Sequence, residues 1–171
     1  MKAIAIVEKL LPDDPRCFVE IELPNSAPSP RDLLVRVKAV PVNPVDYKVR
    51  QRRTAAAREP QVLGWDAAGM VEAVGSEVSF FKPDDKVFYA GDITRPGSNA
   101  EFQVVDERIA ARKPRTLSFA EAAALPFTTI SFDDTDRHWV GMAESQSPRC
   151  AGTFSGTSHV DRLRKAHPFI A

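Results

Sequence analysis

The amino-acid sequence predicts a mainly β fold with short helices, in which the strands close partly into a barrel. Short apolar or alternating stretches recur at intervals of roughly a dozen residues, with turn residues between them. The 14 prolines against 8 glycines also favour strands and loops over a helical bundle. Such even spacing is typical of antiparallel barrels rather than of alternating strand–helix units.

The first strands lie in the amino-terminal part of the chain. Residues 2–7 form an apolar run, and residues 17–23 alternate apolar and polar side chains, as in a strand with one buried face. A longer strand over 32–40 has one apolar face and one face with two basic residues, so we expect one side to be buried and the other wet. Further strands are expected at 69–74, 86–89, 100–105 and 109–112.

Two helix starts can be identified. Asn43 can cap a helix that begins at Pro44, with Asp46 at the third position near the positive end of the helix dipole. Residues 118–125 open a second helix, in which the first residue, a serine, and Glu121 have the spacing of a capping box.

The regular pattern ends near residue 130, so residues 1–130 form one predicted domain. Residues 131–171 contain a polar cluster, a stretch rich in Ser, Thr and Gly, and all three histidines. They show no strand alternation, and only 160–165 hints at a short helix. We therefore expect 131–171 to be a divergent tail that is poorly packed or disordered.

Composition excludes several classes of partner. Lys plus Arg and Asp plus Glu each number 23 in 171 residues, so no charge surplus points to nucleic acid or an anionic membrane. No apolar run approaches the roughly 20 residues of a membrane helix, and the first residues become charged too early for a signal peptide. The two cysteines, Cys17 and Cys150, lie far apart and favour reduced thiols over a disulfide. We expect a cytoplasmic protein.

Four motifs carry a family likeness: Val-Asn-Pro-Val-Asp-Tyr-Lys at 42–48, Leu-Gly-Trp-Asp-Ala-Ala-Gly at 63–69 with its extension to 75, the pair 81–88 and 97–102, and 117–126. In this order the sequence resembles the quinone oxidoreductase and zinc-type alcohol-dehydrogenase-like branch of the medium-chain dehydrogenase/reductase superfamily. The likeness covers residues 1 to about 130 and implies the GroES-like amino-terminal domain, a partly closed β-barrel. Relatives have a glycine where this chain has Asp84, which implies a small loss of stability.

The resemblance also assigns roles to individual residues. In relatives an asparagine at the place of Asn43 lies where nicotinamide and substrate meet, so Asn43 and Asp46 are the predicted catalytic residues. Asn43, Lys48, Thr128 and Ser131 are the predicted cofactor-binding residues. A solvated lysine is the alternative for Lys48, and hydroxyls that close a loop at a domain boundary are the alternative for Thr128 and Ser131.

Trp65 and Asp66 are the predicted substrate-pocket residues, with a core position as the alternative for Trp65. Asp66 takes the place of an acidic residue near the metal in zinc-bearing relatives. Those relatives supply a Cys after the third strand and a His beside the glycine, and here Asn43 and Trp65 fill those places. Because a catalytic zinc site needs about three N, S or O protein ligands, we expect no metal.

No glycine-rich turn of a dinucleotide fold follows residue 130, so we expect the Rossmann domain to be absent, through a frameshift or a truncated gene. The family's activity is NAD(P)H-dependent reduction of a quinone, an enone or a related carbonyl compound, with NADP(H) as the cofactor. We expect this chain alone to bind NADPH negligibly and to be inactive. The alternative is a non-catalytic β-barrel that acts as an interaction module and forms a homo-oligomer.

Overall fold

The computed structural model describes residues 1–7, 10, 14, 16–24, 26–52 and 59–129. They belong to Met1–Ile130, the first of the two units into which the chain divides. The fold of these residues is mainly β with two short helices, which confirms the predicted fold class. The predicted tail at 131–171, which includes Ser131 and all three histidines, lies outside the described residues.

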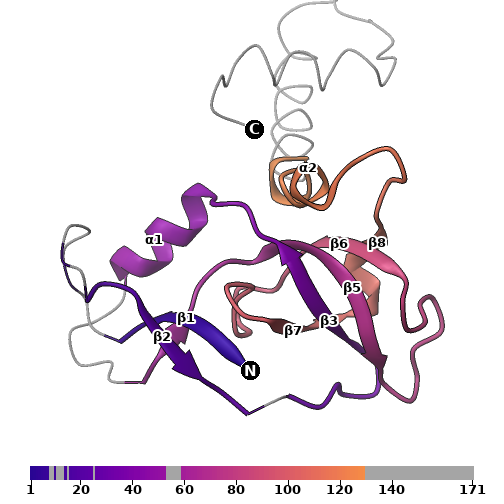
Figure 1. Ribbon diagram of the computed structural model, residues 1–171, viewed down its shortest axis with the longest axis horizontal. Helices are drawn as coiled ribbons and strands as arrows, with labels where there is room; N and C mark the ends of the chain where they lie inside the picture. Colours follow the sequence, from indigo (N-terminus) through magenta and orange to yellow (C-terminus); the bar gives the residue numbers. More distant parts are fainter. Residues whose placement is uncertain (8–9, 11–13, 15, 25, 53–58, 130–171) are drawn as a thin grey trace, which may run out of the picture. The chain divides into compact units, whose positions relative to one another are not determined.

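The strands form two antiparallel sheets (Figure 1). The smaller sheet has the order β2-β1-β4, and the larger one has the order β7-β3-β5-β6-β8. The two sheets meet at a bridge between Ala3 and Ala100, next to which the Ile4 N–H donates to the Asn99 carbonyl at 2.8 Å. The strands are β1 (Lys2–Ile6), β2 (Val19–Glu22), β3 (Asp32–Ala39), β4 (Gln61–Val62), β5 (Asp66–Val74), β6 (Lys86–Ala90), β7 (Phe102–Asp106) and β8 (Ala110–Arg112).

The predicted burial of the long third strand is confirmed. Leu33 and Val35 are fully buried, whereas Arg36 and Lys38 point to solvent. The buried side chains of this strand pack against valines of the neighbouring strands to form the main core. A Cβ on Gly69 of β5 would lie 2.3 Å from the Arg36 carbonyl oxygen, so only glycine lets the two strands approach this closely.

The helices with labels are α1 (Pro44–Arg52) and α2 (Phe119–Ala123), and residues 126–129 are also helical. As predicted, Ser118 and Glu121 form a complete capping box at the start of α2. The helix buries Ala122 and Ala123 against Ala68 of β5, where small side chains allow close packing. A single 3-10 turn, Glu107–Ile109, separates β7 from β8.

Several strand bounds differ from the prediction: β2 is shorter than residues 17–23, and β7 starts at Phe102 rather than at residue 100. β5 begins at Asp66 rather than at residue 69, because its first three residues, Asp-Ala-Ala, show no strand alternation in the sequence. The 3-10 turn takes residue 109, so β8 starts at Ala110. β4 was not predicted, since two residues are too few to show alternation.

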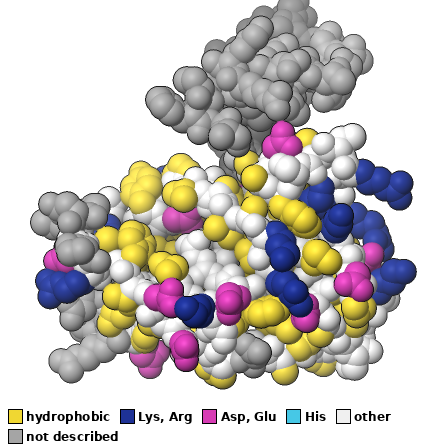
Figure 2. All heavy atoms as spheres, viewed as in Figure 1, with side chains coloured by type: hydrophobic (Ala, Val, Ile, Leu, Met, Phe, Trp, Pro, Cys, Tyr) yellow, Lys and Arg dark blue, Asp and Glu magenta, His cyan; other side chains and the backbone are white. Residues whose placement is uncertain are grey.

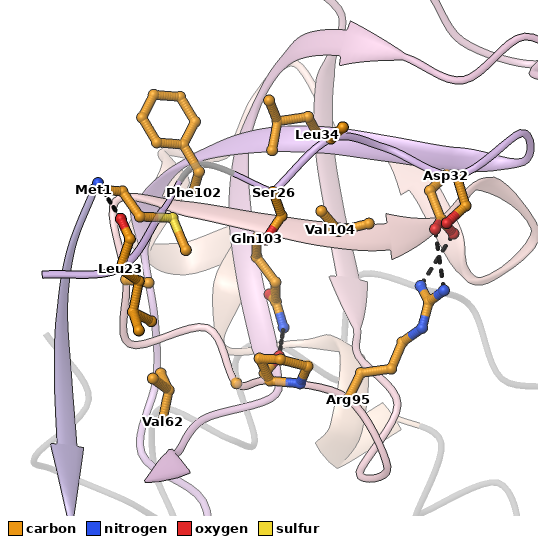
Figure 3. A pocket seen from close by; sticks show the side chains of 15 residues that line it. Met1, Leu23, Ser26, Asp32, Leu34, Val62, Arg95, Phe102, Gln103 and Val104 are labelled. Atoms are coloured by element: carbon orange, nitrogen blue, oxygen red, sulfur yellow. Dashed lines mark hydrogen bonds and ion pairs between the residues drawn. The ribbon is translucent and has the colours of Figure 1, made fainter. Parts of the chain in front are cut away.

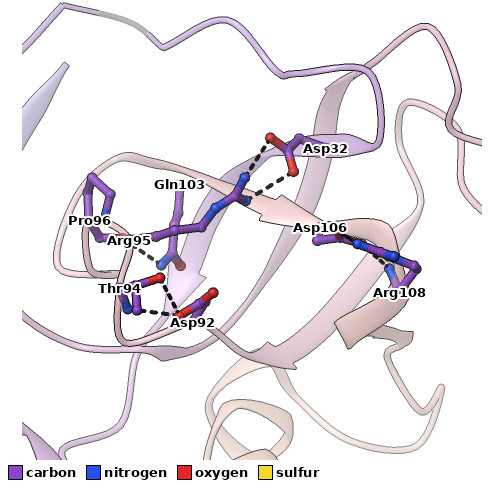
Figure 4. A network of polar contacts seen from close by, with 8 residues as sticks. All are labelled: Asp32, Asp92, Thr94, Arg95, Pro96, Gln103, Asp106 and Arg108. Atoms are coloured by element: carbon purple, nitrogen blue, oxygen red, sulfur yellow. Dashed lines mark hydrogen bonds and ion pairs between the residues drawn. The ribbon is translucent and has the colours of Figure 1, made fainter.

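A half-buried ion pair ties the start of β3 to the loop after β6. The Arg95 guanidinium donates to both carboxylate oxygens of Asp32 at 3.0 Å (Figure 4). The Asp32 side chain is only 4% exposed, and that of Arg95 is 37% exposed. Gln103 of β7 donates its side-chain NH₂ to the carbonyl of Pro96 in the same loop at 3.1 Å, and its side-chain oxygen accepts from the buried Tyr89 hydroxyl at 3.0 Å. The loop is therefore held in two ways: by the ion pair with Asp32, and through Gln103 by hydrogen bonds that reach the buried Tyr89.

Asp84 has the left-handed backbone that the resemblance implied for this position, with φ of 71°. It is the residue other than glycine with a positive φ in the described part of the chain. The Asp84 N–H donates to the Val71 carbonyl at 2.9 Å, so the turn is anchored to β5. The strain is therefore local and does not change the fold.

The described part of the surface is mixed in character. On the face shown in Figure 2, hydrophobic side chains lie scattered among acidic and basic ones. Within the described ranges, no helix is long and apolar enough to cross a membrane.

Replacing Arg95 by Met should destabilise the fold by about 2 to 4 kcal/mol, because Asp32 stays buried without its cation. Urea unfolding measures the change. The double variant Asp32→Asn, Arg95→Met should recover part of the loss. Lys2→Met, which breaks an exposed ion pair with Glu20, should change stability little. Equal losses at Lys2 and Arg95 would contradict the role of burial.

At Asp84, glycine should make the protein more stable than alanine by about 1 kcal/mol, because alanine resists a positive φ. Thermal unfolding of Asp84→Gly and Asp84→Ala tests the order. Ser76 is an exposed turn residue without a positive φ. There alanine should make the protein more stable than glycine, since glycine only raises the conformational entropy of the unfolded chain. The same order at both sites would show that φ is not the cause.

Candidate functional site

The start of α1 brings two predicted site residues together. The helix begins at Pro44, as predicted, but the Asn43 side chain does not cap it. The contact runs the other way: the backbone N–H of Asn43 donates to Asp46 Oδ2 at 2.6 Å. Asp46 is 9% exposed and so closes the first turn from inside. The Asn43 carboxamide is left free for another partner.

That partner is Asp66, the first residue of β5, whose side chain is buried. Asn43 Nδ2 donates to Asp66 Oδ2 at 2.9 Å, and the backbone N–H of Phe127 donates to the same oxygen at 3.0 Å. Phe127 belongs to the helical residues 126–129. Asp66 therefore joins three segments that are far apart in the sequence.

The other carboxylate oxygen of Asp66, Oδ1, is buried and has no hydrogen-bond partner among the described residues. Burial raises the pKa of Asp66 to about 6, above its ordinary value of 3.8. The Phe127 N–H and the Asn43 amide act in the opposite direction, and the charge of Asp46 adds to the rise. A carboxyl with this pKa changes its charge within the physiological range.

Asp46 shares this tendency. Burial raises its pKa as well, against the backbone N–H groups of Asn43 and Gly64. Burial thus makes it unfavourable for Asp46, at the start of α1, and Asp66, at the start of β5, to be ionised at the same time.

The backbone before Asp66 is fixed by a buried serine. The Ser98 hydroxyl donates to the Asp66 carbonyl at 2.9 Å, and the Ser98 N–H donates to the Gly64 carbonyl at 2.6 Å. Gly64 has a φ of +86°, and a Cβ there would lie 2.6 Å from Ser98 Oγ. Glycine is therefore required at this turn, which aims the Asp66 side chain.

Trp65 lies in the core, 4% exposed, against Ile6, Leu63 and the α1 residues Val45 and Val49. This packing favours the alternative that Trp65 is a core residue, and a role at a substrate pocket stays a prediction. The indole Nε1 is buried without a hydrogen-bond partner among the described residues.

The other predicted cofactor contacts are not joined to this group. Lys48 and Thr128 are both exposed, and Ser131 lies outside the described residues. The structure thus brings together Asn43, Asp46 and Asp66.

Three features of the site were missed in the sequence. The Phe127 contact uses a backbone N–H, which leaves no trace in residue type. Ser98 lies within a recognised motif, but its link to Asp66 spans 32 residues. Val42 and Tyr47, which flank Asn43 in the sequence, are 90% and 52% exposed. Large apolar side chains exposed beside a polar group are a usable signal for a ligand surface.

A pocket of about 200 Å³ opens elsewhere, beside the Asp32–Arg95 ion pair (Figure 3). Apolar side chains such as Leu34, Phe102 and Val104 form much of its wall. None of the predicted site residues lines it. Over the described ranges, no three side chains of His, Cys, Asp or Glu come together as a metal site.

The raised pKa of Asp66 makes stability depend on pH. The folded state holds the proton up to about pH 6, the unfolded state only to about 3.8, so the cost of burying the charge appears as pH rises between these values. From pH 4 to 7, Asp66→Asn should gain up to about 3 kcal/mol relative to the parent protein.

Urea unfolding at several pH values measures this difference. Glu20→Gln, which removes an exposed carboxyl, should leave the pH dependence of the parent protein intact. A constant difference between Asp66→Asn and the parent protein across this range would rule out a charged, buried Asp66.

Comparison with known proteins agrees with this fold. The profile of the alcohol dehydrogenase GroES-like domain matches residues 29–115. A zinc-type alcohol dehydrogenase-like protein of Staphylococcus epidermidis is 40% identical over 147 residues, which cover 86% of this chain and 43% of that protein. This match reaches past residue 130, further than the four motifs indicated.

Solved structures show the same fold. A candidate zinc-dependent alcohol dehydrogenase from Rhizobium etli is 57% identical with a TM-score of 0.72, over 76% of this chain and 38% of that one. The Escherichia coli quinone oxidoreductase, solved with NADPH, is 25% identical with a TM-score of 0.59, over 72% of this chain and 36% of that one.

The chain thus spans less than half the length of these relatives. Residues 29–115 include β3, α1 and β5, and with them Asn43, Asp46 and Asp66. The chain belongs to the alcohol dehydrogenase GroES-like domain family, within the medium-chain dehydrogenase/reductase superfamily.

Proposed function

We propose that this domain is the substrate side of an NADPH-dependent reductase that acts on a quinone, an enone or a related carbonyl compound. The observation that carries the proposal is the Asn43 carboxamide, half-buried and held by the buried Asp66. The exposed Val42 and Tyr47 stand on either side of it in the sequence and supply apolar surface for a ring. The E. coli relative, a quinone oxidoreductase solved with NADPH, supports the substrate class.

The residues present fit one end of a nicotinamide cofactor. In the described part of the chain the Asn43 side-chain oxygen accepts no hydrogen bond, so it is free to orient a polar ring substituent. Bound NADPH would supply the hydride. Among the described helices, α1 and α2 begin after Asn43 and Ser118, and neither start is a glycine-rich phosphate turn. The pyrophosphate therefore needs a separate nucleotide-binding domain.

The proposal includes no catalytic zinc. At the two places where zinc-bearing relatives have ligands, Asn43 binds Asp66 and Trp65 packs in the core. Neither side chain is a usual zinc ligand. Activity should therefore survive a metal chelator.

The remaining assignments are proposals of the same kind. Lys48, Thr128 and Ser131 would contact the cofactor, and the protein would work in the cytoplasm on a small molecule. On its own, the 171-residue chain should bind NADPH negligibly and show no turnover, because its described residues present only the nicotinamide end of the site.

A chimera tests the function. Residues 1–129 are joined to the part of the S. epidermidis relative that follows its match to residue 129, and NADPH oxidation is followed with 1,4-benzoquinone and an enone. Asn43→Ala should lower kcat/KM about 10- to 100-fold, the size expected for loss of one polar contact to the reacting ligand. Thr116→Ala, in an exposed turn, is the control.

The 171-residue chain is titrated with NADPH in parallel, with cofactor fluorescence as the readout. Micromolar binding by this chain would overturn its predicted inactivity. A folded chimera that binds NADPH but reduces no acceptor would favour the non-catalytic barrel module instead. Activity that a chelator abolishes would contradict the absence of zinc.

A further inference from the structure

The hydrogen bond between Asn43 and Asp66 has a direction that decides what the site offers. A carboxylate can only accept, so the Asn43 side chain must turn its NH₂ group toward Asp66 Oδ2. The opposite orientation would set the amide oxygen against a carboxylate oxygen. The carbonyl oxygen of Asn43 therefore faces away from Asp66.

We infer that Asp66 is a positioning residue, whose carboxylate locks the Asn43 carboxamide so that its carbonyl oxygen meets a hydrogen-bond donor, an N–H or O–H, on the ligand. The inference rests on the proposed function for the identity of that ligand. It adds which atom of Asn43 binds and what holds that atom in place.

The lock is built from the surroundings of Asp66. Its Oδ2 takes two donors from two segments, Asn43 at 2.9 Å and Phe127 at 3.0 Å. Ser98 holds the Asp66 carbonyl at 2.9 Å, so the side chain starts from a fixed backbone. A buried acceptor with two donors on one oxygen keeps a single orientation.

The unpartnered Oδ1 gives the lock a second state. It is buried and has no donor among the described residues, so it is the oxygen on which a proton would sit. With the proton on Oδ1, Oδ2 is a neutral carbonyl oxygen that still accepts from Asn43 and Phe127, but more weakly than a carboxylate oxygen does. Protonation of Asp66 therefore weakens the hold on the Asn43 carboxamide without reversing its orientation.

Among the described residues, few charges act on Asp66. From α1, Asp46 is the group whose charge acts on it. From β6, Ala90 is its paired residue, and Ser98 and Phe127 face it from the other two segments. None of these three can ionise. The pKa of Asp66 is therefore set by its burial, by the two donors Phe127 and Asn43, and by the charge of Asp46.

NMR of the 171-residue chain without cofactor tests the inference. The side-chain NH₂ protons of Asn43 and the backbone N–H of Phe127 should shift together with pH, with one midpoint near 6, because both donate to the same oxygen. The Gln103 side-chain amide, bound to the Pro96 carbonyl, is the internal control and should stay flat. The chain has only three asparagines, so assignment is direct.

Two variants sharpen the result. Asp66→Asn should abolish both shifts, and Glu20→Gln should leave them. Asn43→Ala, which keeps the carboxyl, should raise the midpoint reported by Phe127, since it removes a donor that lowers the pKa. Separate midpoints for Asn43 and Phe127, or shifts that survive in Asp66→Asn, would overturn the inference. Because neither NADPH nor an acceptor is present, that failure would leave the proposed function untouched.

Discussion

The antiparallel pairing of β3 with β5 is the contact on which the fold and the site both depend. Its register sets Ala39, at the end of β3, opposite Ala68, near the start of β5. The chain that leaves β3 therefore reaches Asn43 at the same edge of the sheet where β5 begins with Asp66. Gly69 allows the two strands to lie this close. The meeting of a carboxamide and a carboxylate 23 residues apart follows from strand geometry.

The local parts of this arrangement could be read from the sequence. Alternation along β3 predicted which side is buried, and the Ser118–Glu121 spacing predicted the capping box. Asn43 and Pro44 predicted the start of α1, but not that the Asn43 side chain leaves the helix for Asp66. Helix capping and strand alternation depend on near neighbours, whereas that bond depends on sheet register.

The long-range polar contacts could not be predicted for the same reason. Asp32 and Arg95 lie 63 residues apart, and each looks like an ordinary surface charge in the sequence. Burial of Asp32 becomes visible only when the loop after β6 folds back over β3. Trp65 could be picked out from its sequence motif, but the motif does not show whether its side chain reaches a ligand. Its packing in the core, which the structure shows, depends on neighbours from other segments.

The bond from Phe127 to Asp66 comes from the main chain, and this affects how the domain can evolve. Every residue type except proline carries the N–H that the bond requires. The hydrogen bond itself therefore requires only that the residue at position 127 is not proline. A main-chain hydrogen bond of this kind can persist when the surrounding residues are substituted, as long as the helical turn at 126–129 is kept.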